Sequence, residues 1–299
     1  MNPYYREYAD FLAEYFDCKV QKLSIDLALS CPNRDGTLGS GGCIYCNNEA
    51  FSPDAAKRGL AVGEQLKRGK AFFAGKYPTM RYLAYFQSYT STYAAHGTLL
   101  DAYSEALADP DVSGLVISTR PDCLPDTLLE RLNELKSTSG KVIMIELGVE
   151  SLHDATLARI NRHHSAATAE DAIRRTANAG FPVGVHLILG LPGETEAMMA
   201  ETVRRISALP VSTVKFHQLP ILRGTALAAM HEKGELADTL VFSAEEYARL
   251  CLSLLPLLRR DIAIDRFVAQ APENLLISPK WGLKNYQFTA LLQKMLANR

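Results

Sequence analysis

The sequence has 299 residues, of which 47% are hydrophobic and 22% are charged, and its formal net charge is −1. This balance is typical of a globular protein and gives no electrostatic preference for nucleic acid or for an anionic membrane. The first residues, MNPYYREYADFLAEYF, lack the basic and apolar regions of a signal peptide, and no apolar run reaches the roughly 18 residues of a membrane helix. We therefore expect a cytoplasmic protein without membrane contact.

Short apolar runs that are rich in β-branched residues alternate along the chain with longer segments of helical periodicity. The runs predict strands at Val20–Leu27, Arg81–Phe86, Gly114–Ser118, Val142–Val149, Val183–Gly190 and Thr213–Gln218. Helices are expected at Val62–Ala74, Thr98–Ala108, Pro125–Lys136, Ala167–Ala179, Glu194–Ala208 and Thr225–His231. Thr168 and Ser243 each precede an acidic residue by three positions, which is typical of a capping box at a helix start.

Strands that alternate with helices predict βαβ units and a parallel sheet. Polar or Gly-rich segments follow nearly every apolar run, which favours a barrel, because barrel enzymes build their sites from loops at the C-terminal ends of many strands. A doubly wound sheet would instead concentrate its ligand contacts at one switch point. We predict an α/β fold with a partial, TIM-like (β/α)6 barrel over residues 1–240. Residues 241–299, with an apolar run at Ile262–Val268 and a terminal helix, are expected to pack on the barrel or cover its mouth.

Three of the six cysteines, Cys31, Cys43 and Cys46, lie within one Gly-rich loop, residues 31–46, directly after the first predicted strand. Structural zinc usually has four protein ligands, and the remaining candidate, Cys18, would lie at the opposite end of that strand. Three thiolates without a fourth suit a [4Fe–4S] cluster that leaves one iron open to another ligand. A zinc site and a set of unliganded buried thiols remain as alternatives.

The segment CPNRDGTLGSGGCIYC resembles the cysteine loop of radical S-adenosylmethionine (SAM) enzymes. Their usual spacing is C-x3-C-x2-C. The longer gap here resembles the subgroup of small YhcC/YtqA-type proteins related to the radical SAM half of the elongator catalytic subunit. The resemblance implies a partial barrel, a [4Fe–4S] cluster, SAM as a second cofactor, and a low-potential electron donor such as flavodoxin or ferredoxin.

The resemblance also implies SAM contacts at the strand ends, namely at Gln87, Ser88, Ser118, Glu150, Arg162 and His186. Arg162 would bind the SAM carboxylate, a task that suits a planar guanidinium, and Glu150 would meet the ribose. The glycines of Gly190–Gly193 would let the backbone approach the adenine. From the residues alone, Glu150 and Arg162 could equally form a surface ion pair, and His186 could be a hydrogen-bonded core histidine.

The elongator resemblance implies chemistry on the wobble uridine of tRNA. The basic stretch Lys57–Arg81 is compatible with phosphate contact, although a solvated helix face explains it equally well. A small metabolite or peptide is the alternative substrate, and a nonenzymatic zinc- or cluster-binding protein is the alternative function. Cys123 follows the third strand and is a speculative catalytic thiol, which could donate hydrogen or bind substrate covalently; an inert thiol is the other interpretation.

Overall fold

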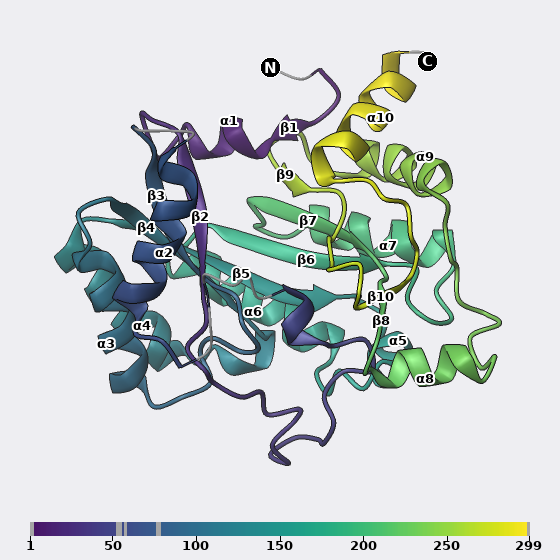
Figure 1. The fold of residues 1–299 in the computed structure, drawn as a ribbon, viewed down its shortest axis with the longest axis horizontal. Coiled ribbons are helices and arrows are strands. Elements are labelled where there is room, and N and C mark those ends of the chain that lie inside the picture. The colour runs from purple at the N-terminus through teal and green to yellow at the C-terminus, as the bar shows by residue number, and fades with distance from the viewer. Residues whose placement is uncertain (1–2, 52–55, 57–58, 76–78, 298–299) are drawn as a thin grey trace.

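The computed structural model describes residues 3–51, 56, 59–75 and 79–297. Its centre is a curled sheet of eight strands in the order β1-β9-β7-β6-β5-β4-β3-β2, and all neighbouring strands are parallel (Figure 1). The strands are β1 (Arg6–Glu7), β2 (Val20–Ile25), β3 (Arg81–Phe86), β4 (Val112–Thr119), β5 (Val142–Glu150), β6 (Val183–Leu189), β7 (Thr213–Gln218) and β9 (Ala263–Arg266). The sheet is open between β1 and β2, so the prediction of a partial barrel is confirmed.

The strands are buried on both faces because helices cover the outside of the curled sheet. Seven consecutive residues of β5, Ile143–Val149, are buried. The helices are α1 (Tyr8–Leu12), α2 (Val62–Ala74), α3 (His96–Ala108), α4 (Asp126–Ser139), α5 (Asp154–Arg159), α6 (Ala166–Asn178), α7 (Glu196–Ser207), α8 (Ala226–Glu232), α9 (Ala244–Leu254) and α10 (Asn285–Ala297). Among the described residues, no helix is long and apolar enough to cross a membrane.

The six predicted strands and the six predicted helices are confirmed, with ends that move by a few residues. The capping box at Ser243 is also confirmed, because its side chain accepts from Glu246 N while the Glu246 side chain accepts from Ser243 N. The box predicted at Thr168 is wrong. Helix α6 begins earlier, and Ser165 is its N-cap, with an Oγ that accepts from Thr168 N at 3.1 Å.

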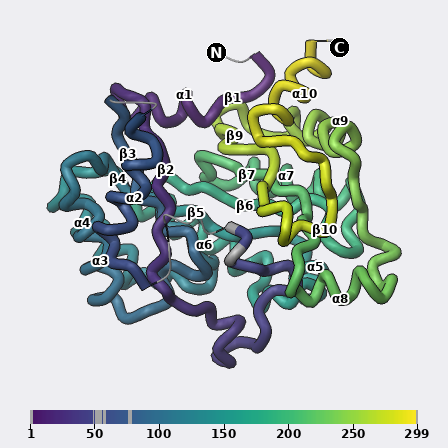
Figure 2. Tube along the Cα trace, viewed as in Figure 1, coloured from purple at the N-terminus to yellow at the C-terminus, as the bar shows by residue number. Residues whose placement is uncertain are grey.

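Residues 241–299 do more than pack on the barrel, because β9 enters the main sheet between β1 and β7. A short strand, β10 (Leu276–Ser278), pairs with β8 (Ile221–Leu222). Helices α9 and α10 pack against each other on the side of β9, as the yellow-green end of the trace shows (Figure 2). Without β9, strand β7 would be an unpaired edge strand. Strand β9, which forms from the apolar run at 262–268, pairs with that edge. The C-terminal segment therefore brings residues of β9 to the interior of the barrel.

Candidate functional site

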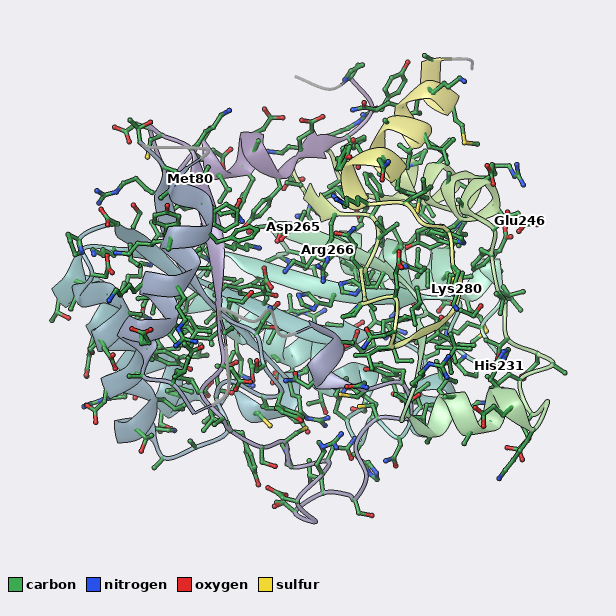
Figure 3. The ribbon with its side chains drawn as sticks, viewed as in Figure 1. Met80, His231, Glu246, Asp265, Arg266 and Lys280 are labelled. Carbon is green, nitrogen blue, oxygen red and sulfur yellow. The ribbon has the colours of Figure 1, made fainter. Side chains whose placement is uncertain are left out.

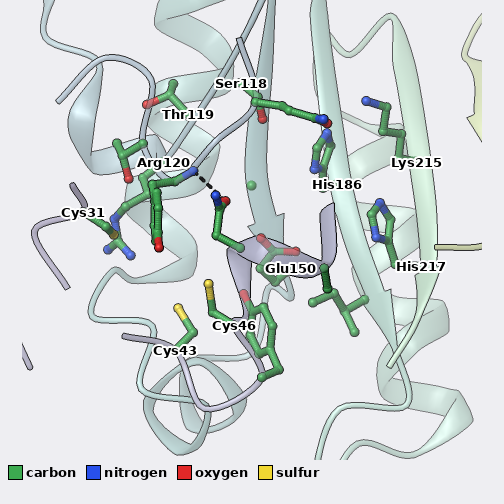
Figure 4. A pocket seen from close by; sticks show the side chains of 18 of the residues that line it. Cys31, Cys43, Cys46, Ser118, Thr119, Arg120, Glu150, His186, Lys215 and His217 are labelled. Atoms are coloured by element: carbon green, nitrogen blue, oxygen red, sulfur yellow. Dashed lines mark hydrogen bonds between the residues drawn. The ribbon is translucent and has the colours of Figure 1, made fainter. Parts of the chain in front are cut away.

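A cavity of about 610 Å³ lies inside the curled sheet, towards the C-terminal ends of the strands, and its size suits a small-molecule site. It is lined by most of the residues predicted from the sequence, namely Cys31, Cys43, Cys46, Gln87, Ser118, Glu150, Arg162 and His186. Figure 4 shows the cysteines on one side of the cavity, Lys215 and His217 on the other, and Glu150 between them. Residues that are far apart in the sequence therefore meet in one cavity.

The cysteine loop runs from the end of β2 to α5 and α8, and backbone hydrogen bonds fix its position there (Figure 2). Ile44 N donates to Ile160 O at 3.1 Å, and Leu227 N donates to Ile44 O at 2.8 Å. Gly41 and Gly42 have φ values of 79° and 83°, a left-handed conformation that favours glycine, and they turn the chain back before Cys43. These glycines allow the long gap between Cys31 and Cys43 to form a compact fold.

Two side chains donate hydrogen bonds to the sulfur of Cys43. Asn33 Nδ2 lies 3.4 Å from Cys43 Sγ, and Arg162 Nη1 lies 3.6 Å from the same atom. Asn33 Nδ2 also donates to Asn161 O, and Asn161 Nδ2 donates to Gly42 O at 2.7 Å. Asn161 and its neighbour Arg162, which is one of the predicted SAM contacts, thus hold the cysteine loop in place. Donors to a sulfur stabilise its thiolate form, which is the form that binds metal.

Cys31, Cys43 and Cys46 all line the cavity, and three thiols suit a [4Fe–4S] cluster with one iron left open. Among the described residues, no three His, Cys, Asp or Glu side chains are grouped so that they could hold one metal ion. A [4Fe–4S] cluster instead takes each thiolate on a different iron, so its ligands surround the cluster and do not converge on one point. Burial, and then the neighbouring Cys43, raise the pKa of Cys46 to about 12, so metal binding must displace its proton.

Arg162 and Glu150 form a buried pair beside the cysteines, and the interpretation as a surface ion pair is wrong. Arg162 Nη2 lies 3.5 Å from Glu150 Oε1, and the exposed fractions of these two side chains are 8% and 11%. Arg162 also donates to Gly148 O and, through Nε, to His164 Nε2 at 3.0 Å. Burial raises the pKa of Glu150, while Arg162 acts in the opposite direction. The guanidinium is therefore fixed at the cavity wall before any ligand binds.

Two polar atoms at this wall are buried without a hydrogen-bond partner among the described residues, Thr90 Oγ1 and Arg120 Nη1. Both residues line the cavity, and Arg120 is only 2% exposed. Its other nitrogens donate to Asp122 and to Arg162 O. Buried polar groups in proteins are nearly always paired, so these two atoms mark a place where a polar ligand fits. Ser88, predicted as a contact, is buried and does not line the cavity; Thr90 does.

The side of the cavity opposite the cysteines carries a buried ionic network that the sequence analysis missed. Lys22 Nζ lies 2.8 Å from Glu146 Oε1 and 2.6 Å from Asp265 Oδ2, and Lys215 Nζ lies 2.6 Å from Glu146 Oε2. His186 Nε2 lies 3.0 Å from the same carboxylate. Burial, and then Lys215, lower the pKa of His186 to about 4, so the ring is neutral at pH 7. His186 therefore lines the cavity as a neutral partner of Glu146.

Two predicted features lie away from the cavity. Cys123 is not among the lining residues, and burial together with Asp122 raises the pKa of its thiol to about 12. The glycines of Gly190–Gly193 also do not line the cavity. A Cβ at Gly190 would meet Leu240 O at 2.9 Å, and one at Gly193 would meet Arg159 Nη1 at 2.7 Å. Contacts within the protein therefore account for these glycines.

The basic stretch 57–81 is only partly described, since Lys57, Arg58 and Lys76 lie outside the described residues. Three of its other cations are engaged within the protein. Arg68 pairs with Glu64, Lys70 pairs with Asp109 and Asp111, and Arg81 donates to Pro110 O. Lys67 is exposed on α2. Three of the four described cations of the stretch are thus engaged in contacts within the protein.

Comparison with protein families shows the superfamily to which the chain belongs. The sequence model of the Radical SAM superfamily matches residues 36–206, more than half of the chain. The chain belongs to the radical SAM superfamily. A second model, that of the Radical SAM C-terminal domain, matches residues 211–298. The chain is therefore a radical SAM enzyme, and its family implies a [4Fe–4S] cluster, SAM and a reductant.

This radical SAM chain is similar over nearly its whole length to two bacterial proteins. It is 33% identical over 288 residues to the uncharacterized protein YtqA of Bacillus subtilis, covering 96% of this chain and 88% of that one. It is 37% identical over 270 residues to protein YhcC of Escherichia coli K12, covering 90% of this chain and 85% of that one. The resemblance to YhcC/YtqA-type proteins is therefore confirmed.

At lower identity, the chain is also similar to larger archaeal proteins. The chain is 26% identical over 188 residues to the tRNA uridine(34) acetyltransferase of Methanocaldococcus infernus, covering 62% of this chain and 33% of that one. The solved structure of M. infernus Elp3 with residues 1–46 deleted superposes with a TM-score of 0.68 at 17% identity, covering 94% of this chain and 63% of that one. This structural likeness shows the fold, and this chain spans less than two thirds of either archaeal protein.

Proposed function

We propose that Cys31, Cys43 and Cys46 hold a [4Fe–4S] cluster and that this radical SAM enzyme cleaves SAM reductively in the adjoining cavity. The observation that carries the proposal is the meeting of three thiols and two unpartnered buried polar atoms, Thr90 Oγ1 and Arg120 Nη1, in one cavity. When bound, the reduced cluster and SAM supply a 5′-deoxyadenosyl radical that abstracts hydrogen from an unreactive C–H bond. An electron donor such as flavodoxin or ferredoxin would reduce the cluster.

The residues of this chain bind and orient the two cofactors. Arg162 contacts Cys43 and faces the cavity, so its guanidinium is placed to bind a carboxylate next to the cluster. Glu150 lies beside it and accepts hydrogen bonds, as binding of a ribose hydroxyl requires. Thr90 and Arg120 offer a hydroxyl and an N–H, and Gln87 and Ser118 line the same wall.

For the substrate, the first candidate is a uridine of tRNA. Support comes from the similarity to the tRNA uridine(34) acetyltransferase and from the shared fold with Elp3. Exposed Lys67 on α2 is available for a phosphate contact. The similarity spans only a third of the acetyltransferase, so we propose for this chain only the radical step on the uridine base and no acetyl transfer.

A small metabolite is the second candidate, and one observation favours it. The described cations of α2 and β3 are mostly paired within the protein, whereas the strongest grouping of charges lies inside the barrel. A substrate that is recognised inside the barrel need not contact the outer surface.

Comparison of tRNA nucleosides tests the first candidate. Total tRNA from a strain that lacks the gene is digested and analysed by mass spectrometry beside the parent strain and a strain complemented with the wild-type gene. The tRNA proposal predicts that one modified uridine is lost or replaced by its precursor, and that complementation with a Cys43→Ala gene does not restore it. Identical nucleosides in all strains would reject tRNA and leave the small metabolite.

A further inference from the structure

The end of the cavity that faces away from the cysteines presents hydrogen-bond donors from two neighbouring strands. Lys215 and His217 lie on β7, and Arg266 lies at the end of β9. All three line the cavity. Figure 3 shows Arg266 and Asp265 in the interior of the molecule, whereas Glu246 and His231 lie at its periphery. We refer to Lys215, His217 and Arg266 as the donor wall.

Carboxylates pair with Lys215 of this wall and with the neighbouring Lys22, but among the described residues none pairs with Arg266. Lys22 and Lys215 share the carboxylates of Glu146 and Asp265. Within the described part of the chain, no carboxylate lies within ion-pair distance of Arg266, and its Nε is buried without a hydrogen-bond partner. Three cations thus face two carboxylates at this end of the cavity, and the excess positive charge belongs to Arg266.

His217 supplies no compensating charge. Its Nε2 lies 3.0 Å from Arg266 Nη2, and its ring stacks on that of His186 with centroids 5.5 Å apart. Burial, and then the Arg266 charge, hold the pKa of His217 well below its usual value, so the ring is neutral. A neutral ring accepts one hydrogen bond from Arg266 and keeps its other nitrogen as a donor. Within the donor wall, Lys215 is therefore paired with carboxylates, whereas Arg266 has no anionic partner among the described residues.

We propose that the donor wall binds an anionic group of the substrate, a carboxylate or a phosphate, with Arg266 as its principal partner. A guanidinium binds planar or tetrahedral oxyanions through two N–H groups at once. Lys215 and His217 lie across the cavity from the cysteines (Figure 4), and Arg266 contacts His217, so an anion there would leave the cofactor side free. The inference names the class of substrate for the proposed function. That the bound anion belongs to a substrate rests on the proposed function, whereas anion binding itself does not.

Anion binding is measured by equilibrium dialysis on the anaerobically reconstituted protein in the presence of saturating SAM, so that a SAM carboxylate occupies the Arg162 side. The probes are radiolabelled inorganic phosphate and, separately, succinate. We expect one of them to bind once per chain, and Arg266→Gln to weaken that binding by about tenfold or more, as loss of a charge-assisted hydrogen bond requires. The probe that binds distinguishes a phosphate substrate from a carboxylate substrate.

Two further variants keep the test decisive. Arg174→Gln removes an exposed arginine that pairs with Glu170 on α6 and should leave binding unchanged. Arg266→Lys keeps the charge but loses the fork of donors, so it should retain weakened binding even if Arg266→Gln does not fold. Absence of binding by both probes, or equal binding by wild type and Arg266→Gln, would overturn the inference. Equal loss in Arg174→Gln would also overturn it, because it would show binding by net charge alone.

The outcomes also distinguish this inference from the proposed function. A wild-type protein that binds the probe through Arg266 but does not cleave SAM would retain the subsite and reject the proposed function. A protein that cleaves SAM but shows no Arg266-dependent anion binding would reject the subsite and retain the function.

Discussion

Arg162 lies against Cys43, with Nη1 3.6 Å from Sγ, so the residue proposed to bind the SAM carboxylate also touches a proposed cluster ligand. The contact is buried, and the guanidinium is held by Gly148 O and His164 as well. A single side chain can therefore affect both the position of SAM and the electronic properties of the cluster.

Arg162→Gln should accordingly change two measured quantities. Loss of a donor and of a positive charge beside a thiolate disfavours the reduced cluster, so the reduction potential becomes more negative in a redox titration followed by EPR. SAM affinity should also fall by about tenfold or more, because a charge-assisted contact is lost. Arg159→Gln, which removes only the exposed pair with Asp238, is the control and should change neither quantity. An unchanged potential would show that the contact with Cys43 has no electronic role.

Replacement of any one of Cys31, Cys43 and Cys46 by Ala should abolish the cluster. Each thiolate is proposed to hold a separate iron, and the described structure shows no fourth thiol in the cavity that could substitute. Iron content and the visible absorbance of the reconstituted protein should fall to background. Cys18→Ala and Cys123→Ala are matched controls from outside the cavity and should retain full iron content. Loss of iron in Cys123→Ala would show that the ligand set is wrong.

Thr90→Val removes the hydroxyl that has no partner but keeps the shape of the side chain. We expect SAM affinity to fall about fivefold, which corresponds to about 1 kcal/mol for one hydrogen bond. The variant should fold normally, because no hydrogen bond among the described residues depends on Thr90 Oγ1. Thr127→Val, at an exposed position on α4, is the control for calorimetric titration. Unchanged affinity in Thr90→Val would remove Thr90 from the proposed site.

Lys215→Met should destabilise the fold, because it leaves Glu146 buried with one lysine and a neutral histidine. Although burial alone would raise it, Lys215 and Lys22 hold the pKa of Glu146 well below its usual value, so the carboxylate stays ionised. Loss of one partner of a buried ion pair costs about 3 kcal/mol. Calorimetric unfolding should show this loss, and Lys215→Met combined with Glu146→Gln should recover part of it.

Lys70→Met is the matched control for that experiment. Lys70, in the C-terminal half of α2, pairs with Asp109 and Asp111 at a partly exposed site, where an ion pair contributes about 0–1 kcal/mol. Equal destabilisation by Lys215→Met and Lys70→Met would contradict the view that loss of a buried ion-pair partner costs more stability than loss of a partly exposed one.

The sequence predicted the strands and the cysteine loop because both signals are local. A run such as VIMIELGV identifies a strand buried on both faces, and the Gly-rich gap identifies a loop that wraps a compact group. Arg162 and Glu150 were found only through the resemblance to a family. Nothing in the sequence shows the left-handed backbone at Tyr89, φ 52°, so the sequence could not show that Thr90 lines the cavity and Ser88 does not.

The ionic network was missed because its members are distant in sequence; Lys22 and Asp265 are 243 positions apart. A usable signal was nevertheless present. Lys22, Glu146 and Lys215 each interrupt a predicted apolar strand, and a charge inside a strand that is buried on both faces needs a partner. The contribution of β9 could not be foreseen in the same way, since its position in the sheet depends on the open edge of β7.

Reductive cleavage of SAM is the most direct test of the central proposal. The protein is reconstituted anaerobically with iron and sulfide, reduced with dithionite, incubated with SAM, and assayed for 5′-deoxyadenosine by liquid chromatography. We predict a brown protein with about four irons per chain that forms 5′-deoxyadenosine and methionine, and a Cys43→Ala variant that forms neither. A colourless protein that binds one zinc ion and leaves SAM intact would contradict the proposal.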